Sequence, residues 1–505
     1  MISSEQTVGK SERIVEAAGQ LNAYVQHAAS QGIAAHEVER GILDYALRIG
    51  KTAMGMYFEL QGTGDLGESL TLPNGDVVKR LEKLHTRPYM SIFGEFQLQR
   101  VVYGSREGQK IEFVPLDTRV LLPEGKFSYL LQEWDQMIST EEPFGKVCSF
   151  LETIFGLEQH VDSLERMSRH MAQEADPFCW SCEIPPPAEE AEILVQTADG
   201  KGVPIRRPAD APRIEDHQPR PGPKPDRKKM ATLGSVYTVD RNIRTPQDVV
   251  DALFRKPDQE RPKSTRPRPC HKHGYARLFC ETEEGEIVDA EAAVFTWIAD
   301  QVGRRDPDGS KEKVCIMDGQ PSLWDTKDLV QGDVATTDIL DLLHVTPRLW
   351  QAAHVFHAKK SRDAEQFVRD RVLRVLQGKT RSVIRGLRRM ASTRNLSKSQ
   401  RADIRRICGY FENNEDCMRY HEYLEKGYPI ASGVIEGACR HIVKDRLERT
   451  GMNWVIPGAQ AMLQLRSIYI NGQWEEFTKF RIEKETERLH PHRSLIDQVQ
   501  WALAT

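Results

Sequence analysis

Apolar residues return every three or four positions through residues 11–60, which places them along one side of a helix. Two runs share this spacing: Ile14, Ala17, Leu21 and Val25, and then Val38, Ile42, Ala46 and Ile49. The pattern predicts two amphipathic helices in an N-terminal helical region, residues 1–70.

The pattern changes to short alternating runs of apolar and polar residues between 72 and 115, and glycines separate the runs. A period of two is typical of strands, and glycine between strands favours turns. We therefore expect a β-hairpin region over 71–126.

Helical spacing then returns over 127–176. Within it, residues 144–153 and 163–173 lie on either side of Gly156, as two helices would across a tight turn. A helix-turn-helix that binds DNA and a plain pair of packed helices both fit this segment. The N-terminal part of the chain is thus predicted to be mostly helical, and under the first of these two alternatives it is a DNA-binding region.

A third pattern follows a proline-rich linker at 176–190, where short apolar runs alternate with helical spacing. A neighbouring stretch, 207–229, is rich in proline and charge, which favours an exposed loop. The order of elements predicts a mixed sheet flanked by helices over 177–345. Strands are expected at 193–199, 232–239, 277–282, 313–317 and 339–344, and helices at 290–302 and 322–330.

Residues 346–427, the basic helical region, are helical in period and dense in basic side chains. From Lys359 to Arg406 there are sixteen Lys and Arg against four Asp and Glu, a local net charge of +12 in a chain whose formal net charge is −4. A charged run is usually a solvated helix face, but so large an excess favours contact with phosphates. The candidate phosphate ligands are Arg381, Arg385, Arg388 and Arg389.

Length and composition narrow the class of protein. A chain of 505 residues has room for two to four domains, and no apolar run of about 18 residues is present to cross a bilayer. The first residues lack the pattern of a secretory signal, and nine cysteines in so long a chain fit reduced thiols better than a disulfide framework. We expect no membrane partner and a cytoplasmic location.

Three carboxylates are the main candidates for chemistry. Asp199 ends the first predicted strand of the sheet, Asp318 ends the fourth, and Glu436 lies in a segment that follows the basic helical region. Where the first and fourth strands are neighbours, two such acids lie side by side, and a helix on the sheet can add the third. Oxygen ligands of this kind suit Mg²⁺ or Mn²⁺. Two such ions would activate a water or a 3′-hydroxyl for attack on a phosphodiester.

Glu436 has two basic neighbours at helical spacing, Arg440 and Lys444. Positions i, i+4 and i+8 share one face of an α-helix, so this face would present one metal ligand and two cations for DNA phosphate. A surface ion pair is the simpler alternative.

Five motifs in a fixed order resemble bacterial insertion-sequence transposases of the ISKra-four family over most of residues 90–480. They are ADGKGVP at 198–204, DG at 318–319, ILDLLHV at 339–345, GYPIASGVIEGACR at 427–440 and DRLERTGMNW at 445–454. The resemblance implies a DDE transposase whose RNase H-like α/β core is split by an all-helical insertion. It assigns the catalytic, metal-binding triad to Asp199, Asp318 and Glu436.

The same resemblance adds a signature and a partner. Asp341 and His344 match the D/C-x-x-H signature of Mutator-like relatives, and Asp341 is the main rival of Asp318 as second metal ligand. The core would be completed by residues 428–470 and followed by a C-terminal tail, 471–505. The implied partners are terminal inverted repeats and target DNA, with a homodimer or larger assembly on DNA in the bacterial nucleoid.

Other signals carry weaker hypotheses. Cys179 and Cys182 have zinc-ligand spacing, but Cys270, His271 and His273 could complete a site only if the chain folds back. Two Gly-Lys-Thr triplets lack the preceding glycine of a phosphate-binding loop. Trp454 could stack on a flipped base or pack in the core.

Sequence reasoning favours metal-dependent cleavage at insertion-sequence ends and strand transfer to target DNA. Two alternatives stay open: a structure-selective nuclease with an RNase H-like core that does not join DNA, and an inactive, domesticated DNA-binding regulator.

Overall fold

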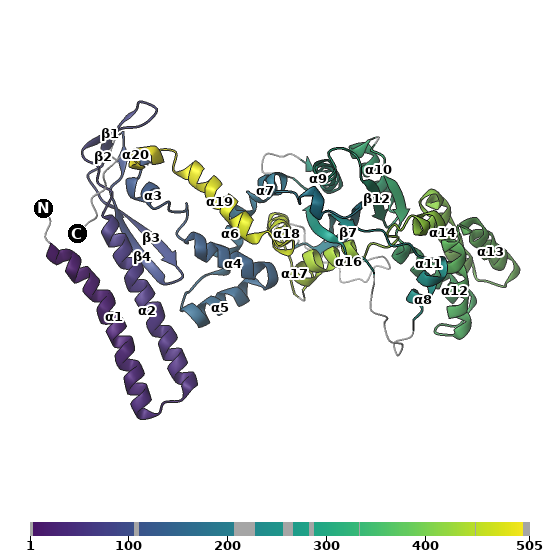
Figure 1. Ribbon diagram of the computed structural model, residues 1–505, viewed down its shortest axis with the longest axis horizontal. Helices are drawn as coiled ribbons and strands as arrows, with labels where there is room; N and C mark the ends of the chain where they lie inside the picture. The colour runs from purple at the N-terminus through teal and green to yellow at the C-terminus, as the bar shows by residue number, and fades with distance from the viewer. Residues whose placement is uncertain are drawn as a thin grey trace, which may run out of the picture. The chain divides into compact units, whose positions relative to one another are not determined.

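The computed structural model describes residues 4–105, 111–206, 228–255, 266–281, 287–332, 334–449 and 451–497. The chain forms two compact units (Figure 1). Unit one comprises Met1–Glu174 together with Trp474–Thr505, and unit two comprises Ala175–Gln473.

Unit one begins with a helical hairpin, as the apolar spacing predicted. Helices α1 (Ser4–Gln31) and α2 (Ala35–Gln61) pack along each other (Figure 1). Gly62 ends α2 with a φ of 68°, a positive value that glycine adopts without strain.

The hairpin region is also present. Strands β1 (Ser69–Thr71) and β2 (Val77–Arg80) pair with β5 (Tyr103–Gly104) and β6 (Ile111–Phe113) in one antiparallel sheet. A separate hairpin pairs β3 and β4, which span His85–Ser91 and Gly94–Arg100.

The rest of unit one is helical and includes the end of the chain. Its helices are α3 (Pro115–Arg119), α4 (Tyr129–Glu141), α5 (Phe144–Phe155), α6 (Val161–Ala172), α19 (Trp474–Leu489) and α20 (Arg493–Asp497). Gly156 ends α5 in the left-handed region, so the two expected helices are present. The segment predicted as a C-terminal tail contains α19, whose buried Arg481 donates to Gln132 of α4 at 3.0 Å.

A buried carboxyl group in unit one leads to the first prediction. Asp135 on α4 is fully buried, its Oδ1 accepts a 3.3 Å hydrogen bond from Gln159, and burial raises its pKa to about 7. Because this pKa is higher in the folded chain than the value of about 3.9 in the unfolded chain, the protonated group stabilises the fold below about pH 3.9. This contribution to the free energy of unfolding is lost as the pH rises to about 7, and the loss is roughly 4 kcal/mol at most. We expect Asp135→Asn to raise the melting temperature at pH 8 but not at pH 4.

Thermal unfolding of wild type and Asp135→Asn across this pH range checks the prediction. Glu165→Gln on the exposed side of α6 is the control, and it should leave the pH dependence unchanged. Parallel pH profiles for wild type and Asp135→Asn would contradict the assignment.

Unit two is built on a five-stranded mixed sheet in the order β13-β12-β7-β8-β9. Strand β7 pairs antiparallel with β8 and parallel with β12; β8 pairs antiparallel with β9, and β12 parallel with β13. The strands span Ile193–Pro204 (β7), Lys228–Val239 (β8), Cys270–Leu278 (β9), Glu312–Met317 (β12) and Thr337–Leu340 (β13). The predicted mixed sheet is thus confirmed.

Alternate residues of the strands enter different cores, because successive side chains point to opposite faces. On one face, Leu194 and Cys315 pack with α9 (Ala290–Arg305) and α10 (Pro321–Gln331). On the other, Ile193 and Val314 belong to a larger core that the basic helical region shares.

Several predicted strand boundaries are wrong. Strand β7 does not end at Asp199, because its twelve residues all pair with β8. Strand β9 begins at Cys270, not at 277. Strand β13 ends at Leu340, because Asp341 caps the helix that follows. Residues 207–227 of the expected loop lie outside the described part, and 228–229 belong to β8.

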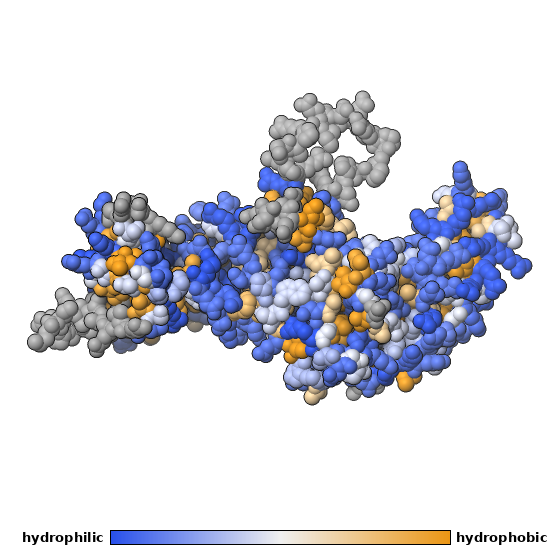
Figure 2. All heavy atoms as spheres, turned by 90° about the horizontal axis from the view of Figure 1, so that it is seen from above, coloured by the Kyte–Doolittle hydropathy of each residue, from blue (hydrophilic) through white to orange (hydrophobic). Residues whose placement is uncertain are grey.

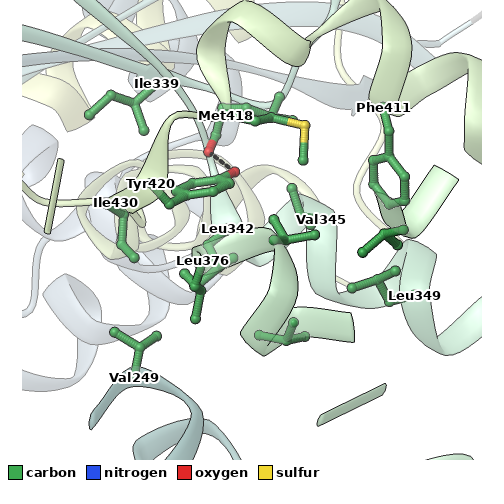
Figure 3. Close-up of a cluster of buried hydrophobic side chains, with 14 of the residues drawn as sticks. Val249, Ile339, Leu342, Val345, Leu349, Leu376, Phe411, Met418, Tyr420 and Ile430 are labelled. Atoms are coloured by element: carbon green, nitrogen blue, oxygen red, sulfur yellow. Dashed lines mark hydrogen bonds between the residues drawn. The ribbon is translucent and has the colours of Figure 1, made fainter. Parts of the chain in front are cut away.

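The basic helical region is helical as predicted, and its helices surround one apolar core. Figure 3 shows Leu342, Val345 and Leu376 converging there with Phe411 and Tyr420. The helices are α11 (Leu342–Phe356), α12 (Arg362–Leu376), α13 (Thr380–Thr393), α14 (Lys398–Asn413) and α15 (Tyr420–Glu425), and α8 (Pro246–Leu253) packs against α12.

The last segment of unit two returns to the sheet. Helix α16 (Gly433–Ala438) packs against β7 and β8, and it continues as a π-helix over Cys439–Lys444 and as α17 (Asp445–Leu447). Helices α7 (Ala175–Ser181) and α18 (Ile456–Ile470) complete the unit. Within the described ranges, no helix combines the length and apolar composition that a bilayer crossing requires.

Candidate active site

Two predicted site residues emerge on the same face of the unit-two sheet. Every second side chain of a strand points to the same face, so Asp199 shares a face with Ile193 and Val195, and Asp318 shares one with Val314 and Ile316. These four apolar residues face the larger core. Parallel pairing of β12 with β7 ends at Ile316 and Thr197, two residues before each acid. The strand register therefore brings the two carboxylates together.

Asp199 is held by two donors and shares its surroundings with both other acids. Its Oδ1 accepts a 2.7 Å hydrogen bond from the Gly200 N–H, and the Cys439 thiol donates to its Oδ2 at 3.4 Å. Burial raises the pKa of Asp199, and the negative charges of Asp318 and Glu436 raise it further. The three acids, named here the three-carboxylate site, thus interact electrostatically.

Asp318 lies directly after β12, as predicted, and is anchored to the basic helical region. The Tyr410 hydroxyl on α14 donates to the Asp318 carbonyl oxygen at 2.6 Å, and the Arg348 guanidinium of α11 stacks 3.6 Å from the Tyr410 ring centroid. Gly319 follows with a φ of 85°, and a Cβ there would lie 2.8 Å from Leu340 Cδ1. Glycine is therefore required at this turn.

Glu436 projects from α16 and contacts the histidine of the signature. Its Oε1 lies 3.3 Å from His344 Nε2, and its side chain is 47% exposed. The start of α16 is fixed by Ser432, whose hydroxyl lies 2.9 Å from that of Thr197 on β7. The sheet therefore sets the position of the helix that carries Glu436.

Asp341 occupies a different environment from the other acids. It is 2% exposed, its Oδ1 accepts the Leu343 N–H at 2.7 Å, and its Oδ2 accepts the Ser432 N–H at 3.0 Å. Burial raises the pKa of Asp341 despite these two donors. Asp318 is more exposed than Asp341, and one of its oxygens, Oδ1, accepts the Gln320 N–H at 2.8 Å. The greater exposure favours Asp318 as the second ligand.

The three-carboxylate site fits a hard divalent cation by its chemistry. Its donors are all oxygens, and the mutual repulsion felt by Asp199 is what a cation would relieve. In the arrangement shown, however, no three His, Cys, Asp or Glu side chains of the described residues are close enough to hold one ion. Binding would therefore require these side chains to move.

The helical spacing predicted after Glu436 is only partly right. Glu436, Arg440 and Lys444 are all exposed, but Cys439–Lys444 form a π-helix, so the α-helical period does not continue to Lys444. Arg440 Nε lies 3.6 Å from Asp445 Oδ1, so Arg440 forms a surface ion pair, but with Asp445 and not with Glu436.

Trp454 is a packing residue in this structure. It is 7% exposed, its Nε1 donates to the Leu447 carbonyl at 3.2 Å, and the Arg446 guanidinium lies 4.9 Å from its ring centroid. Its backbone also pairs with Pro204 and Arg206. The ring is not available to stack on a base in this conformation.

The four candidate arginines of α13 divide into two pairs. Arg381 and Arg388 form 2.7 Å ion pairs with Glu415 and Glu412. Arg385 and Arg389 are exposed and make no ion pair with a described residue. The chain surface around this end of unit two is mostly hydrophilic (Figure 2).

This division gives a prediction about DNA affinity. Replacing Arg385 and Arg389 together by Ala should weaken duplex DNA binding and reduce the slope of log affinity against log salt by about two, since each lost phosphate contact removes roughly 0.9. The matched control is Arg381→Ala with Arg388→Ala, whose charges are already partly compensated. Anisotropy of labelled DNA at several salt concentrations checks this, and equal slopes for both double variants would contradict it.

The cysteine pair considered for zinc has other partners. Burial raises the pKa of Cys179, and Cys182 Sγ accepts a 3.4 Å hydrogen bond from Gln473. Neither belongs to a metal-binding group among the described residues.

Sequence reasoning missed the residues that hold the site in place. Thr197, Ser432, Tyr410 and Cys439 position the acids, but they are ordinary residues with no distinctive spacing. Cys439 and Ser432 lay inside the motif around Glu436, which was the one available signal. No protein-family model matches this chain, and no curated protein sequence matches it.

Proposed function

We propose that this protein is a DDE transposase that cleaves DNA at insertion-sequence ends and joins the freed 3′-hydroxyl to target DNA. The observation that carries the proposal is the strand register, which sets Asp199 and Asp318 after paired strands on one face of a mixed sheet, together with the packing of α16, which carries Glu436, against β7 and β8. The strand order, in which the first and fourth strands are neighbours, supports an RNase H-like core. Five α-helices lie between β13 and α16 in the chain, which supports an all-helical insertion in that core.

In this proposal Asp199, Asp318 and Glu436 hold Mg²⁺, or Mn²⁺ in its place. When bound, the ions would activate a water or 3′-hydroxyl and stabilise the leaving oxygen. Gly200 and Cys439 orient the Asp199 carboxylate, and His344 restrains that of Glu436. Tyr410 fixes the turn that carries Asp318.

The basic side chains would hold the DNA. Arg385 and Arg389 supply uncompensated charge on α13, and Arg440 and Lys444 lie exposed on the helical segment that carries Glu436. Helices α5 and α6 are the proposed reader of the terminal repeats. Because two ends must be joined to one target, the active form on DNA would be a dimer or larger assembly.

One experiment tests the proposal against its two alternatives. Purified protein is incubated with labelled element ends and Mg²⁺, with Ca²⁺ as the non-catalytic control, and the products are mapped. Cleavage at the ends followed by joined products is expected. Cleavage with no joining of a pre-cut end would indicate a nuclease, and binding with no cleavage would indicate a regulator.

A further inference from the structure

A cavity of about 550 Å³ lies beside the segment that carries Glu436, and Glu436 itself is not among its described lining residues. Its walls come from α16 and the π-helix, from β8 and β9, and from the residues that follow β8 and precede β9. Gly433 and Gly437 line it four residues apart, and a Cβ at either would meet no atom within 4 Å. The two glycines therefore leave room beside the helix.

The cavity is strongly basic. Arg244, Arg266, Arg268 and Lys272 line it, and Asp240 is the one acid among its described lining residues. Arg244 donates through Nε to Asn242 and through Nη2 to Tyr428, both at backbone carbonyls and not at a carboxylate. Burial lowers the pKa of Arg244 to about 10, and the charge of Arg266 lowers it further. The described lining thus carries four cationic side chains against one carboxylate, and this excess of positive charge favours an anionic ligand.

The cavity also has apolar walls. Val239, Pro429, Val434, Ile442 and Ile470 line it alongside the cations. A phosphate ion alone would not contact the apolar walls or fill the cavity. A nucleotide carries both an anionic phosphate, which the cations can bind, and a flat apolar base, which can pack on the apolar walls.

We propose that this cationic cavity binds a nucleotide of single-stranded DNA, with its phosphate near Arg244 and Arg266 and its base on the apolar wall. The inference rests on the proposed function, since the strand is that of the DNA substrate. A helix is about 10 Å wide, and a DNA strand advances about 3.4 Å per nucleotide. A strand cut at the three-carboxylate site thus reaches the cavity within a few nucleotides.

Binding without catalysis tests the inference. A fluorescein-labelled trithymidylate is titrated into the full chain in Ca²⁺, with thymidine monophosphate as competitor. We expect Arg266→Ala with Lys272→Ala to weaken binding about tenfold or more, and Gly437→Leu to block it by filling the cavity. Gly437→Ala is the matched control and should bind as wild type, because its Cβ fits the open space.

Two exposed lysines of α19, Lys479 and Lys484, supply the background control. The Lys479→Ala, Lys484→Ala double variant removes the same charge outside the cavity and should bind trithymidylate nearly as wild type does. Unchanged binding in both cavity variants would overturn the inference, and tighter binding of the free mononucleotide than of trithymidylate would overturn its assignment to a DNA strand. Retained binding in a chain that never cleaves DNA would count against the proposed function alone.

Discussion

Asp199→Asn and Asp318→Asn are each expected to lower the rate of DNA end cleavage by about 10³-fold or more, the scale seen when one member of a cooperating catalytic group is removed. The amide keeps the shape of the carboxylate but cannot supply its charge to a cation. DNA end binding should persist, because neither acid contributes to phosphate contact.

The stability of these variants gives a second readout. Burial and the charges of Asp318 and Glu436 raise the pKa of Asp199, so the ionised form is disfavoured in the folded chain. Asp199→Asn removes that cost and should unfold at the same temperature as wild type or at a higher one. Loss of activity with retained stability separates a catalytic role from a structural one.

Cleavage assays, thermal unfolding and anisotropy in Ca²⁺ together check this first prediction. Asp325→Asn, on the exposed side of α10, is the control and should cleave at the wild-type rate. Activity within a few-fold of wild type in Asp199→Asn or Asp318→Asn would refute the assignment of that acid.

Asp341→Ala is expected to act mainly on stability and to lower the free energy of unfolding by about 2–4 kcal/mol. Asp341 caps α11 through Leu343 and holds the Ser432 N–H at the start of α16. Losing a helix cap costs about 1 kcal/mol, and leaving a buried donor unpaired costs about 1–3 kcal/mol. Asp341→Asn keeps one acceptor and should lose less.

Urea unfolding measures this effect, and the cleavage assay then decides between the two rival acids. Asp341→Asn should retain measurable cleavage, while Asp318→Asn should not. If Asp341→Asn folds normally but is as inactive as Asp318→Asn, then Asp341 is a metal ligand and the proposed triad is wrong.

Local chemistry was enough to predict the type of most elements. The apolar spacing predicted α1 and α2, the alternation predicted the hairpins, and the run before Asp318 predicted β12. Each of these signals lies within about ten residues of the chain, where periodicity follows from which face an element buries. The excess of positive charge in the basic helical region is also a property of the sequence alone.

The tertiary structure decided what depends on distant residues. Whether β7 continues past Asp199 depends on β8, whose strand extends to Lys228. Whether Asp341 can bind a cation depends on Ser432, which is 91 positions away. Trp454 is buried because it packs on Arg446 and pairs with β7, and α19 joins the rest of unit one through Arg481 and Gln132. Each outcome depends on a hydrogen bond or an apolar contact between segments that are far apart in the sequence. Such contacts form only when the chain folds, so no local pattern of residues predicts them.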